Sequence, residues 1–147
     1  MPEIYDRLDP WDAGSKWNFD KYQPDVLVLN LCENDSYLVQ HPEAPGYKKR
    51  FPGKGPDDNY IVTAYTRFFQ QLRTKYPNTQ IICALGPLTT SDPSSSWPYY
   101  LKKVITNMGD KKIYTCTFEH LASHPRKAEH QAMANTLIAA IKQYTNW

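Results

Sequence analysis

The sequence has no apolar run that approaches the ~20 residues of a membrane-spanning helix. It also shows no signal-peptide pattern at its beginning, because Asp6, Asp9 and Asp12 interrupt any apolar stretch there. Internal repeats and low-complexity tracts are absent as well. We therefore expect a globular chain with no membrane partner.

Cysteine and histidine are both scarce. Three cysteines are an odd number and cannot form a closed disulfide framework, and no C-x-x-C pair is present. The four histidines lack zinc-ligand spacing, and the separation of His120 and His124 by four residues is weak support for a metal. We expect no metal site. Cys83 and Cys116 fall within predicted strands and Cys32 at a strand end, so all three are expected to be buried free thiols.

The chain has little excess charge. Its formal net charge is +2, with 41% hydrophobic and 22% charged residues, which is ordinary for a globular protein. The basic cluster Lys48-Lys49-Arg50 is short and has no recognised nucleic-acid motif beside it, so we expect a solvated loop and no nucleic-acid partner. A length of 147 residues suits one domain, 1–147, able to bury about 70% of its unfolded surface.

Apolar strands alternate with helical patterns along the chain. The expected strands are 26–31, 80–85 and 112–118, and the expected helices are 57–76, 97–108 and one that starts near Pro125. Helices that separate successive Val- and Ile-rich strands favour an α/β fold with a parallel sheet. Residues 36–57 contain several prolines and glycines and are expected to form a long loop, either covering substrate or decorating the surface.

The most informative stretch runs from Pro24 to Asp35. It reads as a buried parallel strand followed directly by a polar group, Glu33-Asn34-Asp35. In open α/β sheets, ligands bind beyond the carboxyl ends of the strands. A side-chain amide there can donate a hydrogen bond to a developing oxyanion. The tetrad 32–35 resembles the G-x-N-D block of the SGNH hydrolases, with Cys32 in place of the glycine.

A second block supports this resemblance. His124-Pro125, ahead of the last helix, is similar to the final SGNH block, in which a histidine followed by proline serves as general base. The branch that the chain resembles is carbohydrate esterase family 2, whose members are acetyl esterases acting on plant polysaccharides. Further similar segments occur in the family's order, at 1–7, 17–20, 23–25, 73–78 and 84–87.

The resemblance implies a three-layer α/β/α sandwich with a flavodoxin-like parallel sheet, the SGNH hydrolase fold. The family places its nucleophile in an N-terminal G-D-S block, which these residues lack, since the only Asp-Ser pair is Asp35-Ser36. The chain would then be the C-terminal portion of such a domain, with the strand 26–31 left unpaired at one edge. We expect self-association there, or pairing with a missing N-terminal segment. The family also implies secretion.

The same resemblance suggests roles for individual residues. His124 would be the general base, since a neutral imidazole can accept a hydroxyl proton near pH 7, and Asn34 would be an oxyanion donor. The alternatives are a helix cap for His124 and an Asx turn for Asn34. Leu121 stands where many SGNH enzymes have an aspartate, so a backbone carbonyl or Glu119 would orient the imidazole. His130 is expected to have a supporting role.

Asp35 and Cys32 are expected to support the loop. A Cys32–His124 nucleophile pair is the alternative for Cys32, but its position matches a family glycine, which favours a small buried side chain.

The expected activity is hydrolysis of O-acetyl esters on carbohydrate, without a cofactor, by a serine supplied from outside these residues. The alternative is a non-catalytic pseudo-hydrolase domain that binds glycan or a partner protein. Its binding surface would be made of aromatics outside the clearest core pattern, namely Trp11, Trp17, Tyr37, Tyr47, Trp97, Tyr99 and Tyr100.

Overall fold

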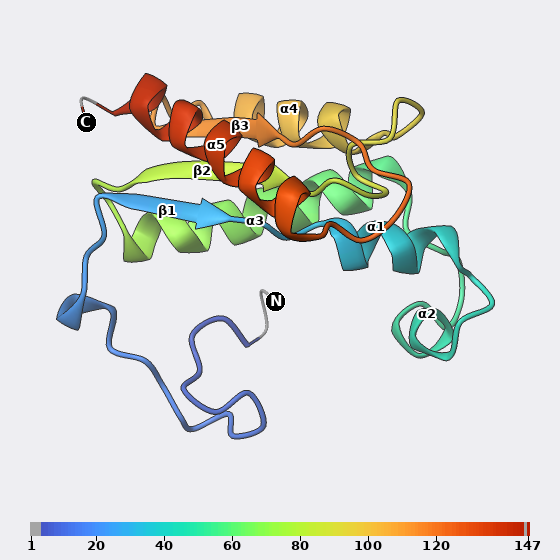
Figure 1. Ribbon diagram of the computed structural model, residues 1–147. Coiled ribbons are helices and arrows are strands. Elements are labelled where there is room, and N and C mark those ends of the chain that lie inside the picture. The colour runs from blue at the N-terminus through green and yellow to red at the C-terminus, as the bar shows by residue number, and fades with distance from the viewer. Residues whose placement is uncertain (1–3, 146) are drawn as a thin grey trace.

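Three parallel strands form the centre of the molecule (Figure 1). The computed structural model describes residues 4–145 and 147. The strands are β1 (Val26–Leu29), β2 (Gln80–Leu85) and β3 (Ile113–Thr117), and they lie side by side in the order β1-β2-β3. Both pairs are parallel, with Val28 opposite Ile82 in the register. The parallel sheet predicted from the sequence is confirmed.

Helices cover both faces of the sheet (Figure 1). Helices α3 (Asp58–Lys75) and α4 (Trp97–Met108) pack on one face and contribute most of the larger core cluster. Helix α5 (Lys127–Tyr144) crosses the other face, over a smaller cluster that includes Ile82 and Ala84. The three-layer α/β/α arrangement is thus confirmed.

Local signals explain the long helix α3. The Asp57 side chain caps it by accepting a hydrogen bond from the Tyr60 amide at 2.8 Å, and Tyr76 follows its last residue. Phe68, Phe69 and Leu72 recur on its buried face. The predicted helix, strand β2 and helix α4 therefore agree with the structure.

The predicted loop over 36–57 is wrong in part. Two helices occupy much of the region, α1 (Glu33–Gln40) and α2 (Pro45–Arg50). Pro45 opens α2 at the helix start, where its missing N–H costs nothing, so proline marks a helix there and not a loop. Strand β1 also ends at Leu29, short of the predicted Leu31, because the chain turns through Cys32 at a φ of 70°.

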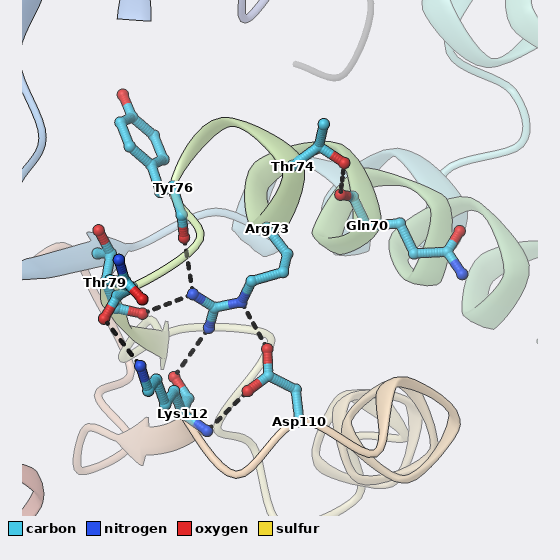
Figure 2. A network of polar contacts seen from close by, with 8 residues as sticks. Gln70, Arg73, Thr74, Tyr76, Thr79, Asp110 and Lys112 are labelled. Carbon is cyan, nitrogen blue, oxygen red and sulfur yellow. Dashed lines mark hydrogen bonds and ion pairs between the residues drawn. The ribbon is translucent and has the colours of Figure 1, made fainter. Parts of the chain in front are cut away.

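The guanidinium of Arg73 ties together the end of the sheet where β2 and β3 begin (Figure 2). It donates to the carboxylate of Asp110 at 2.5 Å and to the carbonyl oxygens of Tyr76 and Thr79 at 2.7 and 2.8 Å. A longer contact of 3.4 Å reaches the Lys112 carbonyl. Hydrogen bonds from a charged group are stronger than neutral ones, so this network fixes the segments that precede β2 and β3.

The N-terminal segment packs near α3. Tyr5 contacts the rings of Phe19 and Phe68, and Phe19 begins a short 3-10 helix, η1 (Phe19–Lys21). The first three residues of the 1–7 stretch, used above in the family resemblance, lie outside the described residues. Among the residues that the structure does describe, β1 pairs only with β2, and no helix is long and apolar enough to cross a membrane.

Candidate active site

A cavity of about 740 Å³ lies beyond the carboxyl ends of the strands. Its walls come from α1, from the segment between β2 and α4, from the first turn of α4, and from the segment between β3 and α5. This is where an open parallel sheet is expected to bind ligands. The lining residues are Ser36, Val39, Gln40, Leu88, Thr89, Asp92, Ser94, Ser95, Ser96, Trp97, Tyr100, His120, Leu121, Ala122, Ser123 and His124.

His124 lies on the wall of this cavity and is exposed. It belongs to the segment between β3 and α5, and no residue in 4–145 forms a hydrogen bond with its ring. The interpretation as a helix cap is wrong, because Arg126 is the N-cap residue and α5 begins at Lys127 instead of Pro125. Its imidazole is therefore free to meet a ligand that enters the cavity.

Asn34 lies in the first turn of α1, so it is part of a helix and not of an Asx turn that leaves the strand. Its side chain is exposed. It is not one of the cavity-lining residues, although Ser36, on the same helix, is. The structure thus places Asn34 and His124 at the same end of the sheet without bringing them to one cavity wall.

Asp35 and Cys32 make contacts that hold α1 in place. The carboxylate of Asp35 accepts a hydrogen bond of 2.5 Å from the hydroxyl of Tyr65 on α3. Burial, together with the nearby Cys32 thiol and Asp35 carboxylate, raises the pKa of Tyr65. Cys32 is 2% exposed, outside the cavity lining, which fits a packing role better than a nucleophile. All three cysteines are buried and free, as predicted.

The remaining predicted residues form no hydrogen bond with His124 in the described part of the chain. Glu119 is exposed and does not line the cavity, and His130 is exposed on the first turn of α5. Two of the aromatics, Trp97 and Tyr100, do line the cavity. The side chain of Trp97 is also part of the core, which the sequence pattern did not indicate.

The cavity wall contains a second histidine, His120. The sequence pattern suggested only a weak metal-ligand role for it. Its Nδ1 donates to the Leu88 carbonyl at 2.8 Å, and its Nε2 lies 3.6 Å from Oδ2 of Asp92. The hydroxyl and amide of Ser94, with a smaller contribution from His120, hold the pKa of Asp92 below its usual value. Because both ring nitrogens face partners, His120 is less available as a base than His124.

Glu33 is the residue whose importance the sequence did not reveal. Its carboxylate accepts hydrogen bonds from the amides of Leu88, Thr89 and Thr90 at 3.1, 2.9 and 3.3 Å. It also accepts from the hydroxyls of Thr89 and Thr90 at 2.8 and 2.7 Å. These partners are 55 to 57 residues away in the chain, so no local pattern could have indicated them.

The curated proteins to which this chain is similar are esterases by name. No protein-family model matches the chain. The cellulase/esterase CelE of Acetivibrio thermocellus is 30% identical over 146 residues, covering 92% of this chain and 16% of that protein. The acetylxylan esterase / glucomannan deacetylase of Cellvibrio japonicus is 23% identical over 153 residues, covering all of this chain and 38% of that protein.

Solved structures give the same result. The family two carbohydrate esterase from Clostridium thermocellum, solved in complex with cellohexaose, superposes with a TM-score of 0.73 at 30% identity, covering 96% of this chain and 42% of that one. The family two enzyme from Cellvibrio japonicus shares the fold with a TM-score of 0.78 at 23% identity, covering 100% and 41%.

The homologues and structural neighbours of this chain are therefore carbohydrate esterases of family 2, with an SGNH-like fold. The resemblance drawn from the two sequence blocks is confirmed. The chain spans about two fifths of the solved relatives and 16 to 38% of the curated ones.

Proposed function

We propose that residues 1–147 form the C-terminal portion of a single SGNH hydrolase-like domain that removes O-acetyl groups from carbohydrate. The observation that supports this most strongly is the cavity of about 740 Å³ at the carboxyl ends of the strands, with an unpaired His124 in its wall. Relatives named as an esterase and an acetylxylan esterase support the reaction class. A relative solved with cellohexaose supports a polysaccharide as substrate.

In the proposed mechanism, a serine supplied from outside these residues attacks the acetyl carbonyl carbon. The imidazole of His124 takes the hydroxyl proton and then returns it to the carbohydrate oxygen as the ester bond breaks. Water attacks the acyl-enzyme in the same way, and acetate leaves. The reaction needs no cofactor.

Asn34 is the proposed oxyanion donor. Its amide would donate to the negatively charged oxygen of the tetrahedral intermediate, a contribution typically worth about 3 to 4 kcal/mol. The exposed position in the first turn of α1 supports this role, because the N-terminal end of a helix also favours negative charge.

Hydrolysis of 4-nitrophenyl acetate by the 147-residue chain, beside His124→Ala, tests the proposal. We expect no turnover above that of the variant, because the serine lies elsewhere. Turnover that His124→Ala abolishes would contradict an external serine, and would place the nucleophile at Cys32 or at a serine of this chain.

A second candidate function is binding of glycan without catalysis. The half-buried Tyr100 in the cavity wall favours it, since aromatic rings can stack on sugar faces. Binding of acetylated xylan without turnover by any longer protein that includes this chain would support binding alone. Turnover by such a protein would support the enzyme.

A further inference from the structure

The five hydrogen bonds of Glu33 all come from one short segment, Leu88–Thr90, which we call the β2 turn because it follows that strand. The carboxylate uses both of its oxygens. Its partners are backbone amides and hydroxyls, which are neutral donors. A carboxylate that accepts several such bonds holds a loop firmly, because charged hydrogen bonds are stronger than neutral ones.

The charge on Glu33 is stabilised where it lies. Burial alone would raise the pKa of this carboxyl, but the hydroxyls and amides of the β2 turn outweigh burial and lower it. Glu33 is therefore ionised at neutral pH, and the donors in the turn share the negative charge spread over its two oxygens.

Gly86 makes room for this contact. A Cβ atom at that position would lie 2.5 Å from Cγ and 2.6 Å from Oε1 of Glu33, closer than such atoms approach in proteins. A larger residue at this position would require the Glu33 side chain to shift. The glycine and the glutamate thus fit each other across two different strand ends.

The β2 turn also holds the segment that carries His124. The carbonyl of Pro87, next to the turn, accepts from the Leu121 amide at 2.6 Å, and the carbonyl of Leu88 accepts from Nδ1 of His120 at 2.8 Å. Both donors lie a few residues before His124. The amides and hydroxyls of the β2 turn thus bind Glu33, while the carbonyls of Pro87 and Leu88 bind the His120–His124 segment.

This connection matters because Leu121 has no group that could orient an imidazole. The position of His124 depends instead on how its segment is fixed to the rest of the fold. We propose that Glu33 is a positioning residue, which sets the place of His124 in the cavity by holding the β2 turn. The inference rests on the proposed function of His124 as the base.

The test uses the folded 147-residue chain and needs no ester turnover. Glu33→Gln keeps the size of the side chain, removes its charge and leaves one acceptor oxygen. We expect the imidazole NMR signals of His120 and His124 to shift and their titration curves to change. We also expect the amides of Thr89 and Thr90 to exchange about tenfold faster or more.

Two further variants make the test specific. Glu43→Gln removes the same charge from an exposed position between α1 and α2, and it should leave both histidine signals unchanged. Thr89→Val removes one hydroxyl donor and preserves side-chain shape. It should move the same signals in the same direction by a smaller amount, and it serves where Glu33→Gln fails to fold.

Unchanged His124 signals and titration in Glu33→Gln or Thr89→Val, equal to those of Glu43→Gln, would overturn the proposal. That outcome would leave the esterase function standing, since it concerns only how His124 is held. Conversely, absence of turnover in a longer protein would contradict the proposed esterase function. A shift of the histidine signals in Glu33→Gln would still establish the connection between Glu33 and the His120–His124 segment.

Discussion

Cys32 has a backbone conformation that disfavours an ordinary side chain. Its φ of 70° is in the left-handed region, where it is the only non-glycine residue among those described. The related blocks of the SGNH family carry glycine at this position, and the conformation gives a physical reason for that preference. The buried thiol fills space against Cys83 and Tyr65.

Cys32→Val should therefore destabilise the fold by roughly 2 to 3 kcal/mol, because a β-branched residue is strained at positive φ. Urea unfolding measures the change. The matched control is Cys83→Val, in the buried regular strand β2, where a similar volume in an extended backbone should cost less than about 1.5 kcal/mol. Equal losses in the free energy of unfolding at the two positions would contradict the claim that the backbone at Cys32 is strained.

At the scale of single residues, sequence patterns indicated His124, Asn34 and Asp35 because they stand at the ends of recognisable elements. They could not indicate Glu33, whose partners lie 55 to 57 residues away, nor the exposure of each side chain. The hydrogen bonds that connect Glu33 with the His120–His124 segment depend on contact between two loops that are far apart in the sequence. Only the structure reveals such a contact.

Among the elements, those with clear periodicity and capping were predictable. Strand β2 and helix α4 have the predicted bounds, and α3 begins after the capping Asp57. The helices α1 and α2 were missed because prolines and glycines around them suggested a loop, and because both helices are short. Their stability comes from tertiary contacts such as that of Asp35 with Tyr65.

The Arg73 network should be important for stability at the end of the sheet opposite the cavity. Arg73→Ala leaves Asp110 and the carbonyls of Tyr76 and Thr79 without their charged donor, at a cost of about 2 to 4 kcal/mol. Thermal or urea unfolding measures this loss. Arg67→Ala, an exposed change on the same helix, should stay within about 0.5 kcal/mol, and a similar loss there would contradict the network's role.

Among the described residues the sheet has two edge strands, β1 and β3, and we consider the β1 edge. Strand β1 pairs with β2 on one side only, and its residues Val26 and Val28 are half-buried. An apolar edge strand of this kind favours pairing with another chain. The helix α5, which packs over the face of the sheet that includes Val26 and Val28, has no fully buried residue of its own.

We expect the 147-residue chain to associate in a concentration-dependent way through the β1 edge. Val26→Lys should weaken that association by about tenfold or more, because an edge lysine opposes strand pairing. Sedimentation velocity over a range of concentrations measures it. Thr106→Lys, on an exposed site of α4, adds the same charge and should leave association unchanged. A monomer at every concentration would contradict the prediction.

We propose that His124 is the base of an ester hydrolase whose serine lies outside these residues. A chimera tests it most directly, in which this chain replaces the equivalent part of the family two carbohydrate esterase from Clostridium thermocellum. The alignment with this chain covers 42% of that enzyme's chain. Circular dichroism and melting temperature would establish that each variant folds alike.

The measurement is kcat for 4-nitrophenyl acetate in the chimera and in its His124→Ala and His130→Ala variants. We predict turnover that falls by about 10²- to 10⁴-fold in His124→Ala, the range expected for loss of a general base, and that changes little in His130→Ala. A folded, active chimera in which His124→Ala turns over as fast as the parent would contradict the account.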